Sequence, residues 1–213
     1  MTIQIVSMQV GKPQVMAYKS ERIMTGIFKT KVTTPALDLT LTGFIGDGQA
    51  DLKHHGGPDK AICVYAEEHY PHWEQELGVL LPCGAFGENL TIRGLTEEEV
   101  CIGDVFAIGE VRLQVSQPRQ PCHKLAKRHN RPDLVLLVQQ TGFTGFYFRV
   151  LEPGLFDSRL PFTLVERHPA GMTVSQANRI YYSKGDLVGI RTLHAIPELS
   201  ASWKATLESR LEV

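Results

Sequence analysis

The sequence has no long hydrophobic run, no excess of charge of either sign and no leader-like start. No apolar stretch approaches the roughly 18 residues of a membrane-spanning helix, so no membrane segment is expected. Twenty-two Lys and Arg against 23 Asp and Glu argue against a protein that mainly coats nucleic acid. Residues 1–10 lack the basic, apolar and small-residue parts of a secretory signal. We therefore expect a cytoplasmic protein with neither a nucleic-acid nor a membrane partner.

Cysteine is scarce, and its spacing excludes the common zinc sites. The four cysteines, Cys63, Cys83, Cys101 and Cys122, form no CxxC pair and lie about 20 residues apart. A chain of 213 residues can bury an adequate core without disulfides, so four reduced thiols are expected. Cys63 and Cys101 fall in apolar strand patterns and are expected in the core.

Several signatures of enzyme active sites are also absent. The sequence contains no GxxxxGK[ST] loop, GxSxG elbow or GxGxxG fingerprint, which weakens the nucleotide-hydrolysing, serine-hydrolase and Rossmann alternatives. Glu68, His69 and His72 share one face of a predicted helix and resemble metal ligands, but no HExxH occurs. A solvated helix face is the favoured interpretation for these three residues.

The first three quarters of the chain predict a mainly β structure. Alternating apolar and polar residues over 37–41 are typical of a half-buried strand, and residues 101–116 predict a hairpin around Gly109-Glu110. Further strands are expected over 26–34, 61–65 and 145–151, and helices over 67–77, ended by Gly78, and from Asp133 to Gln140. Short strands between glycine turns predict a closed or nearly closed barrel over residues 1–165.

The pattern changes to helical near His168. Thr173 and Gln176 form a capping box that opens a helix through Tyr182, and further helices are expected from Gly185 and from Pro197. In the last of these, apolar residues recur every four positions, at Leu199, Trp203, Leu207 and Leu211. Residues 166–213 therefore predict a small three-helix module that packs on the barrel.

The most unusual window surrounds Cys122. Between Arg119 and Arg131 there are five fixed cations and no acid, although the whole chain is nearly neutral. Pro118 and Pro121 favour an extended loop at a strand end rather than a core position. Neighbouring cations favour the thiolate, the form of cysteine that acts as a nucleophile or metal ligand. The window predicts that Cys122 is functional rather than a small core residue.

A second candidate is the loop from His54 to Lys60. Adjacent Gly56 and Gly57 allow the backbone to approach a ligand closely, and His55 and Lys60 supply charge or hydrogen bonds. An anion cradle and a plain turn are equally compatible with this segment.

Several further motifs follow one another along the chain, each weak alone: Gly46-Asp47-Gly48-Gln49-Ala50-Asp51, His55-Gly56-Gly57-Pro58-Asp59-Lys60-Ala61, Phe86-Gly87-Glu88-Asn89-Leu90, Ile102-Gly103-Asp104 and Gln117-Pro118-Arg119-Gln120-Pro121-Cys122. Together they resemble the MOSC family, named for the C-terminal domain of molybdenum cofactor sulfurases, and in particular its YiiM-like branch. Residues 142–151 resemble a strand of that family, and the helical tail resembles the module that follows the barrel in its YiiM-like members.

The resemblance implies a MOSC-type β-barrel that holds the molybdenum cofactor, with Cys122 as the protein ligand of the metal. Expected cofactor-binding residues are His55, Gly56, Gly57, Lys60, Asn89, Arg119, Lys12 and Arg149. Phosphate or sulfate is expected to enter an empty site, because the same cradle favours small oxyanions. His123, beside the thiolate, is a candidate proton donor.

The activity implied by the resemblance is reduction of N-hydroxylated compounds, such as N-hydroxylated purine analogues, to amines. A separate reductase is the expected electron donor, and a homodimer is also considered. The alternative is a carrier that delivers molybdenum cofactor, or persulfide sulfur on Cys122, to other proteins. A structural barrel with an inert Cys122 is the least favoured alternative, because of the basic, proline-rich window.

Overall fold

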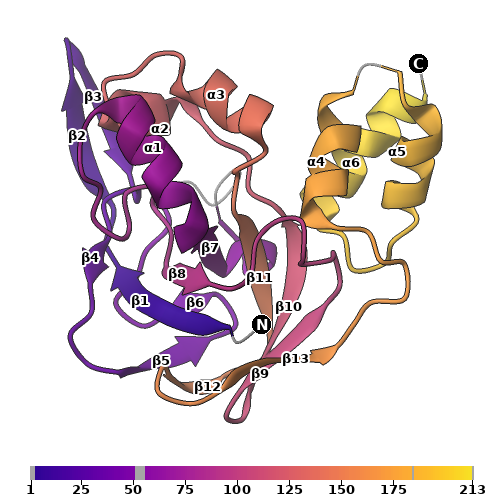
Figure 1. Ribbon diagram of the computed structural model, residues 1–213, viewed down its shortest axis with the longest axis horizontal. Coiled ribbons are helices and arrows are strands. Elements are labelled where there is room, and N and C mark those ends of the chain that lie inside the picture. Colours follow the sequence, from indigo (N-terminus) through magenta and orange to yellow (C-terminus); the bar gives the residue numbers. More distant parts are fainter. Residues whose placement is uncertain (1–2, 51–55, 184, 213) are drawn as a thin grey trace.

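The computed structural model describes residues 3–50, 56–183 and 185–212. Its centre is a curled eight-stranded sheet, flanked on one side by helices and strand pairs and on the other by three C-terminal helices (Figure 1). No helix in the described ranges is long and apolar enough to cross a membrane. The expected mainly β fold with a C-terminal helical module is confirmed.

The large sheet is antiparallel except for one parallel pair, β7 with β8. Its order is β13 (Phe162–Glu166), β9 (Val105–Ile108), β10 (Val111–Pro118), β11 (Phe146–Glu152), β7 (Ile62–Ala66), β8 (Leu90–Arg93), β1 (Gln4–Val10) and β4 (Thr30–Lys31). A second sheet contains β12 (Gly154–Asp157), β5 (Ala36–Thr40) and β6 (Gly43–Phe44), and β2 (Gln14–Tyr18) pairs with β3 (Glu21–Thr25).

The helices are short and fall into two groups. The first comprises η1 (Pro58–Lys60), η2 (Glu67–His69), α1 (Tyr70–Leu77), α2 (His123–Arg128) and α3 (Leu134–Thr141). The second is the three-helix module of α4 (Val174–Tyr182), α5 (Leu187–His194) and α6 (Ala201–Leu211). The predicted capping box at Thr173 is present, and Gly78 ends α1 in the left-handed conformation.

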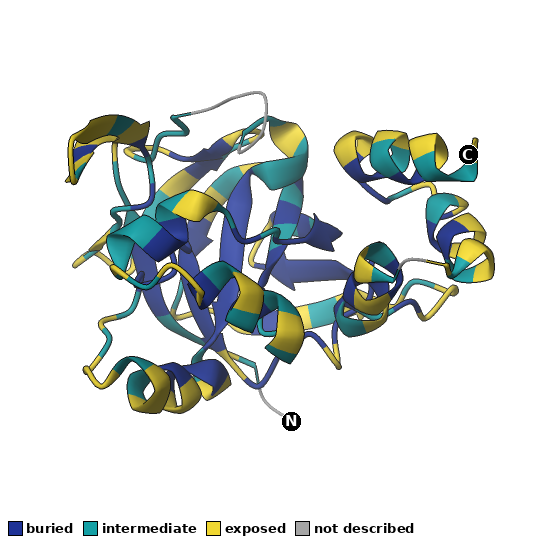
Figure 2. Cartoon of the chain, turned by 90° about the horizontal axis from the view of Figure 1, so that it is seen from above, coloured by how far each residue is buried: buried dark blue, intermediate teal, exposed yellow. Residues whose placement is uncertain are grey.

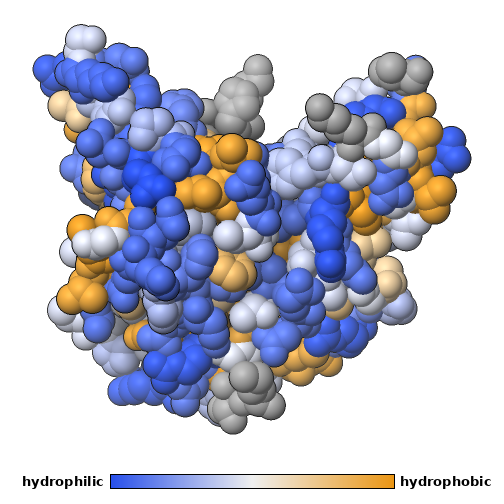
Figure 3. Space-filling model, turned by 45° about the horizontal axis from the view of Figure 1, so that its top comes forward, coloured by the Kyte–Doolittle hydropathy of each residue, from blue (hydrophilic) through white to orange (hydrophobic). Residues whose placement is uncertain are grey.

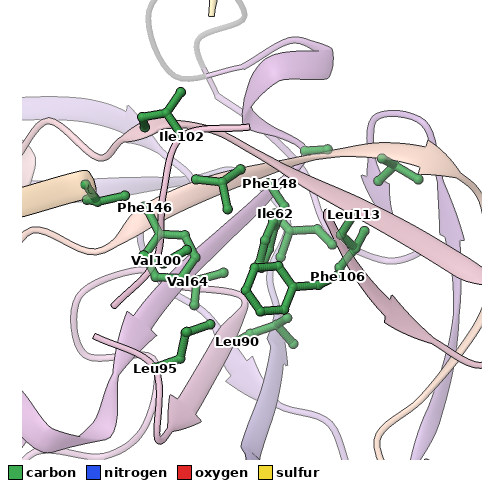
Figure 4. Packing of buried hydrophobic residues seen from close by; sticks show 14 of the residues in the cluster. Ile62, Val64, Leu90, Leu95, Val100, Ile102, Phe106, Leu113, Phe146 and Phe148 are labelled. Carbon is green, nitrogen blue, oxygen red and sulfur yellow. The ribbon is translucent and has the colours of Figure 1, made fainter. Parts of the chain in front are cut away.

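One hydrophobic cluster joins the sheet to the C-terminal module. Ile62, Phe106 and Phe148 pack together at the centre of the sheet (Figure 4), where the strands are almost wholly buried (Figure 2). Trp203 and Leu207 of α6 belong to the same cluster. Burying such a side chain contributes about 1.5–3 kcal/mol, so the module and the sheet stabilise each other. The predicted apolar stripe of the last helix is the face that makes this contact.

The structure corrects four local predictions. The strand expected over 26–34 is reduced to Thr30–Lys31, because the preceding residues turn into the pocket described below. The basic window contains a helix, α2, that the sequence analysis missed. Asp133 precedes α3 but its carboxylate binds Arg131 instead of capping the helix. The predicted solvated helix face is confirmed for Glu68 and His72, which are exposed. The prediction is wrong for His69, which is buried against Glu97.

Candidate functional site

A pocket opens beside Cys122 where several loops meet at the ends of β7, β10 and β11. The space between its walls, counting the part open to solvent, is about 670 Å³. The described residues that line it are Thr25, Gly26, Ile27, Lys29, Asp47, Gly48, Gln49, Ala50, Lys60, Cys63, Phe86, Gly87, Asn89, Arg119, Gln120, Cys122, Lys124 and Tyr147. Segments far apart in the sequence therefore build one site.

The structure brings four of the predicted site residues together: Lys60, Asn89, Arg119 and Cys122 all line the pocket. His55 lies outside the described residues. The segment 56–57 precedes η1 and leads to Lys60, but neither glycine lines the pocket.

Three other predicted residues lie away from the pocket lining. Lys12 is exposed in the turn between β1 and β2. His123 is exposed at the first position of α2. Arg149 projects from β11 to the Asp59 carboxylate, with its Nε 2.9 Å from Oδ1. A cofactor contact from any of these three stays a prediction.

Cys122 is held at the start of α2. Its backbone is extended, with φ −121° and ψ 166°, and its carbonyl oxygen accepts a hydrogen bond from the Leu125 N–H at 2.9 Å. The side chain is half-buried in the pocket wall. The extended segment after β10 that the prolines predicted is therefore present, but it leads directly into the unpredicted helix α2.

The five cations of the basic window divide into two groups. Arg119 and Lys124 line the pocket. Arg128 donates to the carbonyl oxygens of Ile27 and Gly84, at 2.5 and 2.8 Å. Lys127 pairs with Glu21 and Arg131 with Glu76 and Asp133. The window therefore supplies two cations to the pocket, while its other three fix the surrounding loops.

Arg119 is buried although it carries a charge. Its Nη2 donates to the Phe86 carbonyl oxygen at 2.7 Å, and its backbone N–H donates to the Gly145 carbonyl oxygen at 3.0 Å. Only 6% of the residue is exposed. No carboxylate neutralises the guanidinium in the described contacts, so its charge is available to an anion in the pocket.

The sequence analysis missed a buried ion pair in the pocket wall. Lys29 pairs with Asp47, and their side chains are 6% and 7% exposed. Asp47 also accepts hydrogen bonds from the Gly11 N–H and the Asn89 side-chain amide, each at 2.8 Å. Asp47 lies in a motif that the sequence had identified, but Lys29 carried no local signal, because 18 residues separate it from Asp47.

Two groups in the pocket are kept uncharged. Burial raises the pKa of the Cys63 thiol to about 11. Burial likewise raises the pKa of Tyr147, and the nearby Cys63 adds to this. Cys63 is the buried strand residue that the sequence predicted, and its thiol also faces the pocket as a neutral group at pH 7.

Glycine allows the loops that line the pocket to approach each other. A Cβ at Gly48 would lie 2.5 Å from Cδ of Pro13, and one at Gly26 would lie 2.8 Å from the Gly48 carbonyl oxygen. Any larger residue at these positions would push the loops apart.

The residues that line the pocket suit a metal that is already bound by an organic cofactor. In the described part of the chain, no group of three or more His, Cys, Asp and Glu residues could hold a bare ion. The described lining instead offers the thiol of Cys122, together with Lys29, Lys60, Arg119 and Lys124 and the carboxylate of Asp47. A pterin cofactor brings its own sulfur ligands to molybdenum and carries a phosphate, so these residues fit it.

Comparison with known proteins identifies the family of the chain. Residues 51–158 match the MOSC domain, and residues 172–213 match the YiiM-like 3-alpha helix domain. YflK of Bacillus subtilis is 52% identical over 95% of this chain and 91% of its own. A Gibberella moniliformis protein named "Reductase" is 35% identical over 74% of this chain, which spans 28% of that longer protein.

A solved structure of the YiiM-like branch has the same fold. The crystal structure of YiiM from Geobacillus stearothermophilus superimposes with a TM-score of 0.84 and 41% identity, covering 98% of this chain and 99% of that one. MOSC domains are associated with molybdenum cofactor binding. The chain therefore belongs to the MOSC family and, within it, to the YiiM-like branch.

Proposed function

We propose that the protein is a molybdenum cofactor-dependent oxidoreductase that reduces N-hydroxylated compounds to amines. The observation that carries the proposal is the position of Cys122, a half-buried thiol in a pocket whose described lining holds four cations and one carboxylate. The family membership and a relative named as a reductase support the same activity.

Different residues of the pocket bind different parts of the cofactor. Cys122 holds the metal, because a thiolate is a soft ligand that molybdenum accepts. Arg119, Lys60 and Lys124 hold the phosphate and the polar edge of the pterin. When bound, the cofactor supplies a metal that changes its oxidation state by two electrons.

The reaction requires two electrons and two protons for each N–OH group, and it releases one amine and one water. The electrons come from a separate reductase. Lys29 and Lys124 lie in the pocket wall, and His123 lies on the surface next to Cys122. Substrates include N-hydroxylated purine analogues.

The test is the molybdenum content of purified protein from a host that makes the cofactor. Wild type and Cys83→Ser are expected to hold nearly one metal per chain, and Cys122→Ser almost none, with unchanged far-UV circular dichroism. Cys83 is the matched control, because it is also half-buried and lies outside the pocket lining. Equal metal in all three proteins would remove Cys122 as the ligand.

Turnover separates reduction from the carrier alternative. With a chemical electron donor and an N-hydroxylated base, the loaded protein is expected to form many equivalents of amine per chain. A carrier would transfer at most one cofactor or one sulfur atom for each Cys122, and that result would overturn the reductase assignment.

A further inference from the structure

Asp59 joins three parts of the molecule that are remote in sequence. Its Oδ1 accepts hydrogen bonds from Nε and Nη2 of Arg149 on β11, at 2.9 and 2.8 Å. Its Oδ2 accepts a hydrogen bond from the Ala201 N–H at the start of α6, at 3.1 Å. The next residue, Lys60, lines the pocket. One carboxylate thus links the helical module, the sheet and the pocket.

The backbone around Asp59 is fixed by the same junction. The Ser116 hydroxyl on β10 donates to the Asp59 carbonyl oxygen at 2.5 Å, and the Ser200 N–H donates to the Ser116 carbonyl oxygen at 2.9 Å. The first N–H groups of a helix have no partner within the helix, and the helix dipole favours a negative charge there. Asp59 supplies both the acceptor and the charge to α6.

On its other side, the turn that carries Asp59 is held by Gln49, which also lines the pocket. The Gln49 amide donates to the Lys60 carbonyl oxygen at 3.0 Å, and its carbonyl accepts the Gly57 N–H at 3.1 Å. The turn η1 is therefore held between the pocket wall and the helical module, which stands out from the body of the molecule (Figure 3).

We propose that Asp59 is a positioning residue, through which the N-terminus of α6 sets the place of the Lys60 ammonium in the pocket. The inference rests on the proposed function, because it takes the pocket as the site of an oxyanion group. It gives the three-helix module a role in ligand affinity in addition to its packing on the core.

The test measures binding of inorganic phosphate to the full-length, cofactor-free protein by calorimetry. Asp59→Asn keeps the size of the side chain and removes its charge. We expect phosphate to bind this variant roughly 3- to 30-fold more weakly than wild type. Asp59→Glu is expected to recover part of the affinity. Asp157→Asn is the matched control, because Asp157 also pairs with an arginine, Arg159, and lies away from the pocket.

A second variant, Lys60→Met, separates this inference from the proposed function. If Lys60→Met and Asp59→Asn both weaken phosphate binding while Asp157→Asn does not, the inference is supported. If only Lys60→Met weakens it, Asp59 has no positioning role and the pocket assignment stands. If Lys60→Met binds like wild type, the anion site itself is wrong. Should Asp59→Asn not fold, Arg149→Gln replaces it, because it removes the cation that orients the same carboxylate.

Discussion

The side-chain amide of Asn89 donates a hydrogen bond to Oδ2 of Asp47 at 2.8 Å, across 42 residues of sequence. The amide oxygen of Asn89 accepts the Cys63 N–H at 3.0 Å, and its nitrogen also donates to the Gln9 carbonyl oxygen at 3.3 Å. Asn89 therefore joins β7, β1 and the loop that carries Asp47. Its side-chain donors and acceptor are thus used inside the protein, at a position that lines the pocket.

Asn89→Ala is expected to lower the free energy of unfolding by about 2–4 kcal/mol, because it leaves the buried Cys63 N–H without a partner and takes one hydrogen bond from the Asp47 carboxylate. Urea denaturation followed by tryptophan fluorescence measures the loss. Gln14→Ala, on the exposed end of β2, is the control and should change stability by less than about 0.5 kcal/mol. Equal stability of the two variants would contradict the structural role of Asn89.

Arg119→Gln is expected to weaken phosphate binding about 10-fold or more, since it removes a buried charge from the pocket. It should also cost about 1–3 kcal/mol of stability, because the contact to the Phe86 carbonyl oxygen is weakened. Charge reversal is unsuitable here, because a glutamate would face carbonyl oxygens. Arg112→Gln is the matched control: Arg112 also donates to two carbonyl oxygens, on the β9–β10 hairpin away from the pocket. Unchanged phosphate affinity in Arg119→Gln would remove Arg119 from the anion site.

Glu88→Gln is expected to destabilise the loop that leads to Asn89. The buried Glu88 carboxylate accepts hydrogen bonds from the Gly84 N–H at 2.7 Å, the Phe86 N–H at 3.0 Å and the Tyr70 hydroxyl. An amide would turn N–H groups toward these donors, which costs about 1–3 kcal/mol. Thermal unfolding measures the change.

The control for Glu88 is Glu99→Gln. Glu99 also accepts two hydrogen bonds, from the N–H and hydroxyl of Thr96, but lies on the surface. We expect less than about 0.5 kcal/mol for this variant. A loss in Glu99→Gln as large as that in Glu88→Gln would show that burial of the acceptor is not the cause.

The raised pKa of the Cys63 thiol predicts that the protein loses stability at alkaline pH. Burial raises the pKa of its thiol from 9.0 to about 11, so the folded state holds this proton more tightly than the unfolded state. The resulting stabilisation is complete below pH 9 and is lost as the pH rises through about 11. The stability difference between wild type and Cys63→Ala should therefore shrink by about 2–3 kcal/mol over this interval. A difference that stays constant from pH 8 to pH 11 would contradict the assignment.

Much of the fold followed from local patterns. The capping box at Thr173, the left-handed Gly78 and the apolar stripe at Trp203 depend on residues within one or two turns of each other, so the sequence predicted them correctly. The position of Cys122 also followed locally, because its prolines restrict the backbone whatever the rest of the chain does.

The set of residues that line the pocket could not be predicted from local sequence patterns. Lys29 gave no local signal, and Arg149, which the sequence suggested for the cofactor, pairs with Asp59 across 90 residues. His69, expected on a solvated face, is buried because the Glu97 loop folds over it. Each of these outcomes depends on which loops meet after the sheet has formed.

The mainly β class, the helical tail, the family resemblance and the basic, proline-bounded thiol could all be predicted from the order of the residues, since each depends on motifs and short-range conformational preferences. Which cations face the pocket, which pair with carboxylates elsewhere, and the contact of α6 with Asp59 emerge only in the folded chain. The reason is physical: strand register and sheet curvature bring distant side chains within hydrogen-bond distance, and no short stretch of sequence contains that information.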